Sequence, residues 1–345
     1  MRYLRLILAD VGLLLLAALV GWAVLQLTQP ANVLAGHQGP VVALAFSPDG
    51  RLLASASTDN TIRLWRMADR RLDRVLTVPV TGGGAWSVVF TPDGRTVIAG
   101  YGDGEVRQWR VADGQALGAL TGHTGAVTGV AVTPDGSQVV SASEDGTLCI
   151  WDTGANTLPR IITGTVGALS SVAVSPDGQQ LAAGGEWGQV GLWQISDESA
   201  VVVLSDPHSS HVMPPKTGVA FSPDSQAIGS AAPAYKGQVT VWRVADGILL
   251  NRINVVGDPI RAFSGGEDVM NTIAYAGSSR WIATNRDEEV WLWDTAHNSR
   301  AALWKGHSRA VRSLAVSPDG RWLASGSDDK TVRLWPLTGL IGSAP

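Results

Sequence analysis

The sequence predicts an all-β fold in which seven small antiparallel sheets form a ring, preceded by a single N-terminal transmembrane helix. Three observations lead to this. A unit that ends in tryptophan recurs every 42 to 51 residues. Most units carry a Ser-Pro-Asp-Gly type of turn between two short apolar runs. The first thirty residues form a separate, strongly apolar stretch. We therefore divide the chain into an N-terminal anchor, residues 1–30, and a ring domain, residues 31–345.

The N-terminal stretch has the pattern of a membrane span. Arg2 and Arg5 precede an uncharged run, Val11–Leu27, and the next lysine or arginine is Arg51. As a helix this run would be about 25 Å long, at the short end of what crosses a bilayer. Basic residues on the N-terminal side place that end in the cytoplasm. We expect a single-pass, membrane-anchored protein whose ring lies on the periplasmic or extracellular side.

A cleaved signal sequence is the alternative. Val33-Leu34-Ala35 before Gly36 has the small residues that a signal peptidase site needs. Against this, the apolar run is longer than a usual signal core. Cleavage there would also remove residues 31–35, which the ring needs for a reason given below. The anchor is the favoured interpretation, and cleavage remains open.

The repeated unit reads as strands joined by tight turns. In the first unit, short β-branched and apolar runs at 41–46, 52–57 and 61–65 alternate with turns. Proline presets φ, aspartate bonds its own backbone and glycine accepts positive φ, so Ser47-Pro48-Asp49-Gly50 forms a turn. This turn or a Thr-Pro-Asp-Gly variant recurs at 91–94, 133–136, 175–178 and 317–320; 222–225 is a near copy, and 276–280 departs from it. The tryptophans that end the units are Trp65, Trp109, Trp151, Trp193, Trp242, Trp293 and Trp335.

A period of this length, with Gly-His near the start and tryptophan near the end, resembles the WD40 repeat. The resemblance covers about residues 34–338. It implies a seven-bladed WD40-type β-propeller, in which sheets pack face to face around an axis. In that family the N-terminus supplies the outer strand of the last blade. Residues 31–35 are placed to be that strand.

The same resemblance gives a role to three sets of polar residues. They are similar to the family's structural tetrad, in which tryptophan, serine, histidine and aspartate form a chain of hydrogen bonds. The sets are His37, Ser57, Asp59 and Trp65; His123, Ser143, Asp145 and Trp151; and His307, Ser327, Asp329 and Trp335. A catalytic Ser-His-Asp triad is the rival, but a catalytic site is needed once, and no G-x-S-x-G motif is present.

The other blades depart from the tetrad. Thr81 and Gly266 stand where histidine would align, and Trp187 and Lys236 stand where aspartate would. Because their networks are incomplete, we expect faster amide exchange in residues 160–300 than in blades one, three and seven.

The composition argues against several classes of function. The net charge of −4 and the pI of about 5.9 do not indicate the basic surface that nucleic-acid binding requires. Cys149 is the single cysteine, and neither CxxC nor HExxH occurs. We predict no enzyme, no cofactor and no metal site. The resemblance implies a scaffold that binds protein or peptide partners.

Two extended connections, 196–218 and 253–272, mark blades four to six as the expected recognition sector, because extra length in a repeat protein often lies on its binding face. Aromatic and arginine side chains are common binding hot spots. The candidate partner-binding residues are Trp187, Tyr235, Arg261, Phe263 and Arg286.

A propeller enzyme, or a small-ligand or metal-binding protein, is the alternative function. It would use the central channel or the 196–218 loop, where His208, His211 and Met213 are possible copper ligands. Their spacing matches no specific metal site.

Overall fold

The computed structural model describes residues 32–77, 83–153, 158–163, 166–197, 199–205, 217–232, 238–254 and 272–341. The seven sheets lie in the compact unit Val33–Pro345, and their first strand begins one residue earlier, at Asn32. In the described ranges no helix has the length and apolar character that crossing a membrane requires. Residues 1–30, on which the anchor prediction falls, lie outside those ranges.

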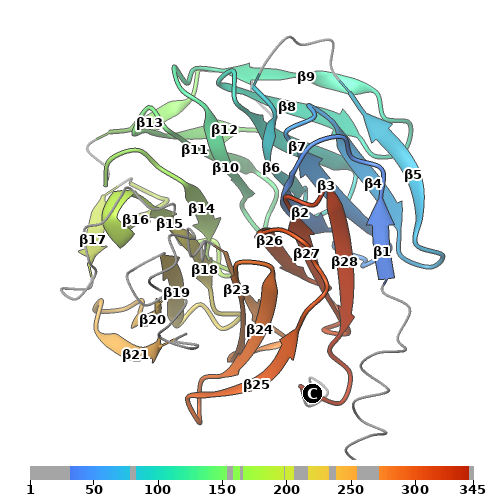
Figure 1. Ribbon diagram of the computed structural model, residues 1–345. Helices are drawn as coiled ribbons and strands as arrows, with labels where there is room; N and C mark the ends of the chain where they lie inside the picture. Colours follow the sequence, from blue (N-terminus) through green and yellow to red (C-terminus); the bar gives the residue numbers. More distant parts are fainter. Residues whose placement is uncertain are drawn as a thin grey trace, which may run out of the picture. The chain divides into compact units, whose positions relative to one another are not determined.

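The ring unit consists of seven four-stranded sheets, each a blade of a β-propeller (Figure 1). The innermost strands of blades one to seven are β2 (Val41–Phe46), β6 (Ala85–Phe90), β10 (Val127–Val132), β14 (Ser171–Val174), β18 (Gly218–Phe221), β22 (Ile273–Ala276) and β26 (Val311–Val316). The second strands are β3 (Leu52–Ser57), β7 (Thr96–Tyr101), β11 (Gln138–Ser143), β15 (Gln180–Gly184), β19 (Ala227–Ala232), β23 (Ser278–Arg286) and β27 (Trp322–Ser327).

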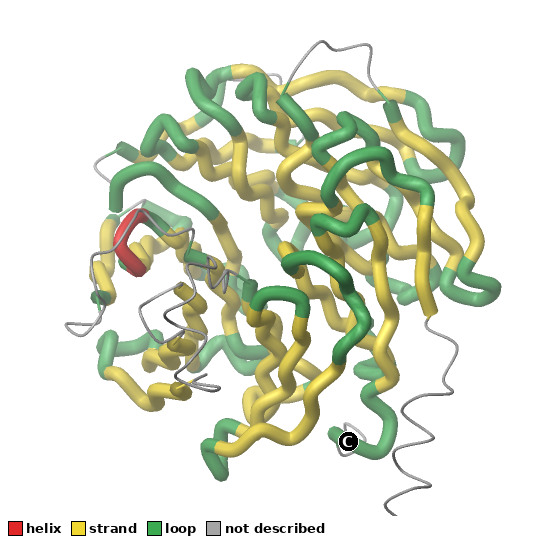
Figure 2. The backbone as a smooth tube through the Cα atoms, viewed as in Figure 1, coloured by secondary structure: helices red, strands yellow, loops and turns green. Residues whose placement is uncertain are grey.

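The third strands end near the repeat tryptophans: β4 (Ile62–Arg66), β8 (Glu105–Arg110), β12 (Leu148–Asp152), β16 (Val190–Gln194), β20 (Gln238–Arg243), β24 (Glu289–Asp294) and β28 (Thr331–Pro336). The outer strands are β5 (Arg71–Leu76), β9 (Ala116–Thr121), β13 (Arg160–Ile162), β17 (Ala200–Leu204), β21 (Leu249–Asn254), β25 (Ser299–Trp304) and, for blade seven, β1 (Asn32–Ala35). Strands dominate the tube in Figure 2, and the segment marked as helix is the short 3₁₀ turn η1 (Glu186–Gly188).

Blade seven takes its outer strand from the N-terminal end of the described chain. Its strand order is β1-β28-β27-β26, so β1 lies beside β28 although three hundred residues separate them. Leu34 of β1 is 3% exposed and packs with Val332 and Leu334 of blade seven and Trp65 of blade one. Residues 32–35 therefore complete the seventh sheet and close the ring.

The apolar core lies between neighbouring blades. One cluster joins Ile62 and Leu64 of blade one to Val97 and Trp109 of blade two. Innermost strands contact one another in the order β2, β6, β10, β14, β18, β22, β26 and back to β2. Since each blade buries both faces against its neighbours, no single sheet could be stable alone.

The Ser-Pro-Asp-Gly turns connect the first and second strands. In blade one, Ser47 Oγ donates to Asp49 Oδ1 at 2.6 Å, and Gly50 takes the left-handed φ of 68° that the turn requires. In blade five, Ser225 holds the same conformation at φ 59°. Its hydroxyl accepts a hydrogen bond from the Asp177 amide of blade four at 3.1 Å, and this contact compensates for the less suitable residue.

Candidate functional site

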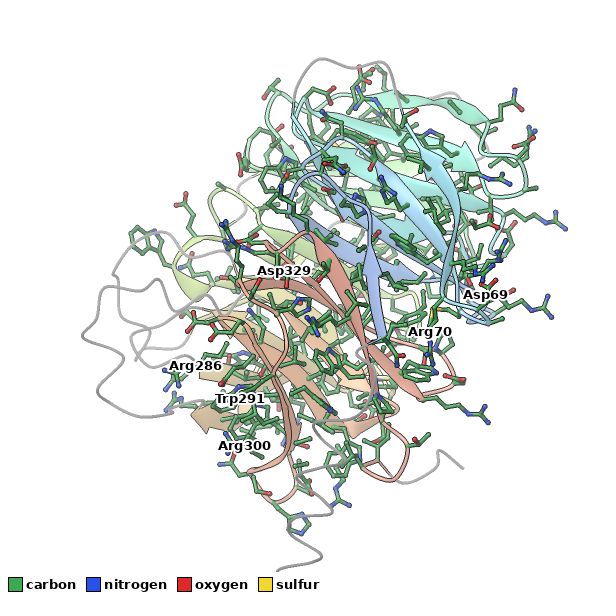
Figure 3. The ribbon with its side chains drawn as sticks, turned by 45° about the vertical axis from the view of Figure 1, so that its right-hand side comes forward. Asp69, Arg70, Arg286, Trp291, Arg300 and Asp329 are labelled. Atoms are coloured by element: carbon green, nitrogen blue, oxygen red, sulfur yellow. The ribbon has the colours of Figure 1, made fainter. Side chains whose placement is uncertain are left out.

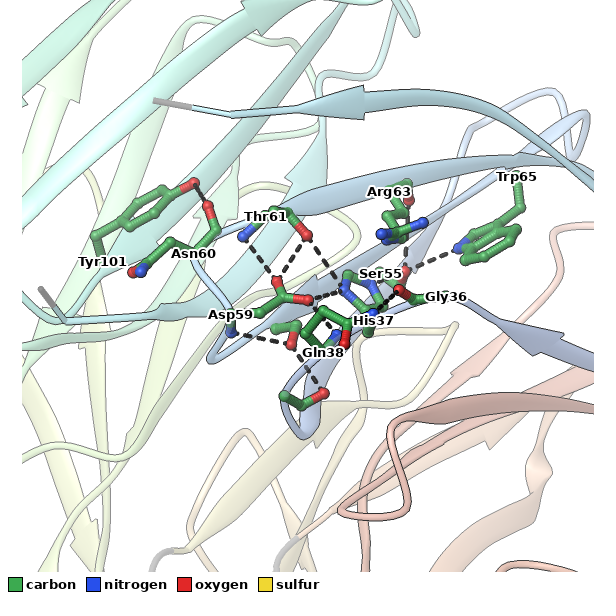
Figure 4. Close-up of polar contacts among 12 residues, drawn as sticks. Gly36, His37, Gln38, Ser55, Asp59, Asn60, Thr61, Arg63, Trp65 and Tyr101 are labelled. Carbon is green, nitrogen blue, oxygen red and sulfur yellow. Dashed lines mark hydrogen bonds and ion pairs between the residues drawn. The ribbon is translucent and has the colours of Figure 1, made fainter. Parts of the chain in front are cut away.

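Blade one contains a buried chain of four side chains (Figure 4). Trp65 Nε1 donates to Ser55 Oγ at 2.8 Å, and Ser55 Oγ lies 2.8 Å from His37 Nε2. His37 Nδ1 lies 2.9 Å from Asp59 Oδ2. An ionised carboxylate can only accept, so the imidazole proton belongs on Nδ1, and Nε2 accepts from the serine hydroxyl. Every polar group in the chain is thus satisfied.

Blades three and seven repeat this geometry. In blade three, Ser141 Oγ lies 3.0 Å from Trp151 Nε1 and 2.8 Å from His123 Nε2, and His123 reaches Asp145 at 3.1 Å. In blade seven, Ser325 Oγ lies 2.8 Å from both Trp335 Nε1 and His307 Nε2, and His307 Nδ1 lies 2.8 Å from Asp329 Oδ2.

The serine predicted for each network was wrong by two residues. Ser55, Ser141 and Ser325 take the place predicted for Ser57, Ser143 and Ser327. Trp65 pairs across the sheet with Leu53, so the next residue on the same face is Ser55, and Ser57 lies a further pair away. Ser57 Oγ instead donates to the Gly39 carbonyl at 3.0 Å and accepts from the Asp59 amide at 3.1 Å.

A fifth residue, which the sequence reasoning missed, completes each network. Thr61 Oγ1 donates to Asp59 Oδ1 at 2.6 Å, and Thr147 and Thr331 make the same contact with their own aspartates. The signal was present in the sequence, because threonine follows the network aspartate by two positions in all three blades.

Burial and hydrogen bonding set the charge states of these groups. Burial lowers the pKa of His123 and of His307 and favours the neutral ring. Burial opposes ionisation of Asp145 as well, but hydrogen bonds from Thr147 and from the Thr124 amide outweigh it and lower its pKa to about 2. Neutral histidine beside ionised aspartate is the state that the hydrogen bonds require.

The networks have a structural role. Ser55, Ser141 and Ser325 are each 0% exposed, so no substrate reaches their hydroxyls. A catalytic serine must be accessible to its substrate and accompanied by an oxyanion site. These chains of hydrogen bonds instead hold the turns between strands in place and orient the tryptophan toward the next blade.

Blade two replaces the histidine–aspartate contact with an ion pair. Arg107, only 6% exposed, binds both carboxylate oxygens of Asp103 and lies over the ring of Tyr101 at 4.4 Å. Ala99 stands opposite Arg107, in the register position that Ser55 holds in blade one. Within the described residues, the buried indole N–H of Trp109 therefore has no hydrogen-bond partner. Thr81, the predicted histidine counterpart, lies outside the described residues.

In blades five and six the tryptophans find other hydroxyls. Trp242 Nε1 donates to Thr240 Oγ1 at 3.1 Å, and Thr240 in turn contacts Ser230 at 2.6 Å. Trp293 Nε1 donates to Thr284 Oγ1 at 3.2 Å. These substitutes satisfy the indole without histidine or aspartate. Gly266 and Lys236, the residues predicted to interrupt these networks, lie outside the described residues.

A cavity of about 360 Å³ opens among the innermost strands. Blades one, two, three, four, five and seven all contribute to it, so it lies at the axis of the ring and forms the mouth of the central channel. Its lining, which we call the channel mouth, is Pro40, Val42, Thr58, Trp86, Thr128, Ser170, Thr217, Arg312 and Asp328.

Two hydroxyl groups of the channel mouth join neighbouring blades. Thr128 Oγ1 donates to the Leu169 carbonyl at 2.8 Å, and Ser170 Oγ donates to the Thr217 carbonyl at 2.9 Å. The rest of the lining comprises Thr58 and Thr217, the apolar and aromatic side chains of Pro40, Val42 and Trp86, and an ion pair. Arg312 Nε lies 2.9 Å from both carboxylate oxygens of Asp328, and both side chains keep some exposure.

Only two of the five predicted partner-binding residues lie in the described part of the chain. Trp187 is 38% exposed and occupies η1 with φ 60° and ψ 25°, a left-handed conformation that is rare for a large side chain. Arg286 ends β23 in blade six (Figure 3). Tyr235, Arg261 and Phe263 lie outside the described residues, as do residues 206–216 of the first predicted insertion and 255–271 of the second. The described part of the first insertion contains the outer strand of blade four, β17, so this stretch is a regular blade strand and not added length. Neither Trp187 nor Arg286 belongs to the channel mouth.

The sequence reasoning missed Trp86, Arg312 and Val42 as site residues. They occupy one repeat position, five residues after the Gly-His histidine or its counterpart, which reads Val, Trp, Thr, Ser and Arg in blades one to four and seven. A core position would not exchange valine for arginine. This variation at one position of an otherwise apolar strand could have indicated that the position faces the channel.

Among the described residues, no group of three or more His, Cys, Asp or Glu side chains is arranged to hold a metal ion. His208, His211 and Met213, the possible copper ligands, lie outside the described residues.

Comparison with known proteins agrees with this geometry. The family model for the WD domain, G-beta repeat, matches residues 28–66, 74–110, 114–152, 156–194 and 299–336, together more than half of the chain. It leaves out most of blades five and six.

Individual relatives match over one or two repeats. Protein HIR1 of Mycosarcoma maydis is 36% identical over 78 residues, which is 22% of this chain and 8% of that protein. Ribosome biogenesis protein BOP1 of Rattus norvegicus is 64% identical over 38 residues, 11% of this chain and 5% of that protein. Nuclear distribution protein PAC1 of Tuber melanosporum is 48% identical over 65 residues, 18% of this chain and 14% of that protein. The chain thus spans a small part of each relative, and by its repeats and its seven-bladed ring it belongs to the WD40 repeat family.

Proposed function

We propose that this protein is a non-catalytic, membrane-tethered WD-repeat scaffold that binds a protein or peptide segment at the channel mouth. The observation that carries the proposal is the 360 Å³ hollow, in which Trp86, Val42 and Pro40 face an Arg312–Asp328 ion pair. A tryptophan and an arginine beside an apolar surface are the side chains that dominate protein recognition. The buried hydroxyls of the tetrads offer no catalytic alternative.

The tether is proposed from the N-terminal sequence. Arg2 and Arg5 precede the apolar run Val11–Leu27, and the positive-inside rule then puts the propeller on the periplasmic or extracellular side. Two measurements test this part. The full chain should sediment with membranes and a chain lacking residues 1–27 should not. A reporter fused after Pro345 should be active only where an exported reporter is active, and cytoplasmic activity would contradict the proposed orientation.

The recognition surface is tested by site-specific photo-cross-linking in the native membrane. A photo-reactive residue at position 42, in the channel mouth, should yield a cross-linked partner. One at position 117, on the exposed outer strand β9, serves as the control. The product at position 42 should disappear when Trp86→Ala is added. A product at 117 alone, or a product at 42 that Trp86→Ala leaves unchanged, would place the binding surface elsewhere.

A further inference from the structure

The outer edge of blade four differs from the other outer edges. In the described residues each outer strand is the last strand of its sheet, and such an edge can pair with another chain. Charged side chains protect most of these strands: β5 carries Arg71, Asp73 and Arg74, and β13, β21 and β25 carry Arg160, Arg252 and Arg300.

Three outer strands carry no charged residue, and two of these have another feature that disfavours pairing with a further strand. β1 has only four residues, and β9 contains Gly118 at φ 134°, a conformation that weakens a strand. β17, with the sequence Ala-Val-Val-Val-Leu, has no charge, no glycine and no proline. Its composition is that of a strand prone to pairing.

β17 is held firmly in its sheet. It pairs with β16 through Val190 and Leu204, Gly191 and Val203, and Leu192 and Val202, and beyond a shift in register through Trp193 and Ala200, so its regular edge is Val202–Leu204. Leu204 is 3% exposed, and Val202 packs against the same cluster, which includes Trp242 of blade five. On the opposite face Val203 is 53% exposed. The regular part of the strand therefore presents a backbone edge together with the exposed side chain of Val203.

The net charge of the sequence that contains this edge favours one kind of partner. Residues 111–215, which run from the outer part of blade two through blades three and four, contain ten acidic residues and one basic residue, Arg160. The rest of the chain has 25 basic and 20 acidic residues. Asp197, just before β17, is exposed. A second copy of the chain would bring two acidic regions together, whereas a basic segment would meet a complementary field.

We propose that β17 binds an extended polypeptide segment that has an apolar, β-branched centre and basic residues at its ends, and that this segment adds to blade four as a fifth strand. Backbone hydrogen bonds along the edge supply affinity, and Val203 with its acidic surroundings supplies selectivity. This surface is separate from the channel mouth, so either proposal can fail without the other.

The test uses the full chain in detergent micelles and two synthetic peptides. Both have a Thr-Val-Thr-Val-Thr centre, one with two lysines at each end and one with two glutamates at each end. Fluorescence anisotropy should show binding of the lysine peptide only, weakening as salt is added. Amide hydrogen exchange should slow in β17 when the lysine peptide binds, and in no other outer strand.

Variants on exposed positions locate the contact. Val203→Lys should weaken binding of the lysine peptide by about threefold to tenfold, because it removes a cross-strand apolar pair and adds like charge. Leu250→Lys, on the 47% exposed site of β21, is the matched control and should leave binding unchanged. Trp86→Ala should also leave it unchanged, which separates this edge from the channel mouth.

Three results would overturn the proposal. The first is no binding of the lysine peptide, or equal binding of the glutamate peptide. The second is protection of another outer strand in place of β17. The third is a concentration-dependent dimer that Val203→Lys abolishes, since this would assign the edge to a second copy of the chain.

Discussion

Trp65 donates its indole N–H to the hydroxyl of Ser55, ten residues earlier in the chain, in a buried hydrogen bond of 2.8 Å. The same hydroxyl lies 2.8 Å from His37 Nε2, so one serine connects the tryptophan of a blade to its histidine and aspartate. Ser57, on the same strand, takes no part in this contact.

A double-mutant cycle should separate the two serines. Ser55→Ala should lower the free energy of unfolding by about 2–4 kcal/mol, because it leaves two buried groups, the Trp65 indole and the His37 ring, without a partner. Trp65→Phe should couple to Ser55→Ala by more than about 0.5 kcal/mol and should be additive with Ser57→Ala, which shares no hydrogen bond with the indole. Urea unfolding gives these energies. Equal coupling to both serines would contradict the assignment.

Blade two should be stabilised by Ala99→Ser. The added hydroxyl would stand where Ser55 stands in blade one, within reach of the unpartnered Trp109 indole. A satisfied buried hydrogen bond is worth about 0.5–1.5 kcal/mol, so the midpoint of urea unfolding should rise. Ala142→Ser, at a 0% exposed position of blade three, is the matched control. It introduces a buried hydroxyl away from an indole and should lower stability. The interpretation fails if both variants are destabilised alike.

Acid should weaken the fold in two steps. His123 and His307 have folded pKa values below the ordinary 6.5, so the unfolded chain takes up protons first and stability falls as pH drops below about 6.5. Asp145 has a folded pKa of about 2 against an ordinary 3.8, so its contribution is present above pH 4 and is lost as pH falls from there toward 2. Urea midpoints measured between pH 7.5 and pH 3 should decline throughout. A rise between pH 7.5 and pH 5 would show that protonated histidine is the favoured state.

In the closing strand β1, a substitution at position 34 should lower stability, and one at the adjacent position 33 should have little effect. Leu34→Ala removes a side chain that is 3% exposed and joins blades seven and one, and should cost about 2–4 kcal/mol. Val33→Ala, at a 37% exposed site on the same strand, should change stability by less than about 0.5 kcal/mol. Thermal unfolding of the two variants is the measurement. Similar small effects at both sites would mean that β1 contributes little to closure.

Amide exchange should be faster in residues 160–300 than in blades one, three and seven. The three full networks each fix a histidine, an aspartate and a threonine around one turn, whereas Trp242 and Trp293 contact only nearby hydroxyls. Exchange followed by mass spectrometry in the native state reports local opening directly. Uniform protection across the seven blades would show that the tetrads do not determine how readily each blade opens.

Much of the fold was predictable because its signals are local. Strand alternation, the turn chemistry seen at Ser47–Gly50 and a tryptophan at the end of each unit all act within a few residues. The tryptophan recurs in all seven units and the turn in most of them. A ring of sheets needs each blade to be complete, so the short strand at 32–35 could also be placed from the sequence.

Side-chain partners in the site were less predictable. Ser55 and Ser57 have the same residue type and lie on the same face of β3, and only the cross-strand register with Trp65 decides between them. Arg107 could not be recognised as the substitute for a histidine, because it approaches Asp103 from the adjacent strand position and not from the loop that precedes the blade.

The sequence by itself determined how many blades there are, where their strands and turns fall and which residues are apolar enough to be buried, since these depend on period and local backbone preference. Only the tertiary structure decided which hydroxyl each tryptophan meets and which residues share the channel mouth. Val42, Trp86 and Arg312 are far apart along the chain, and they come together because closure of the ring brings the same position of every blade to one axis.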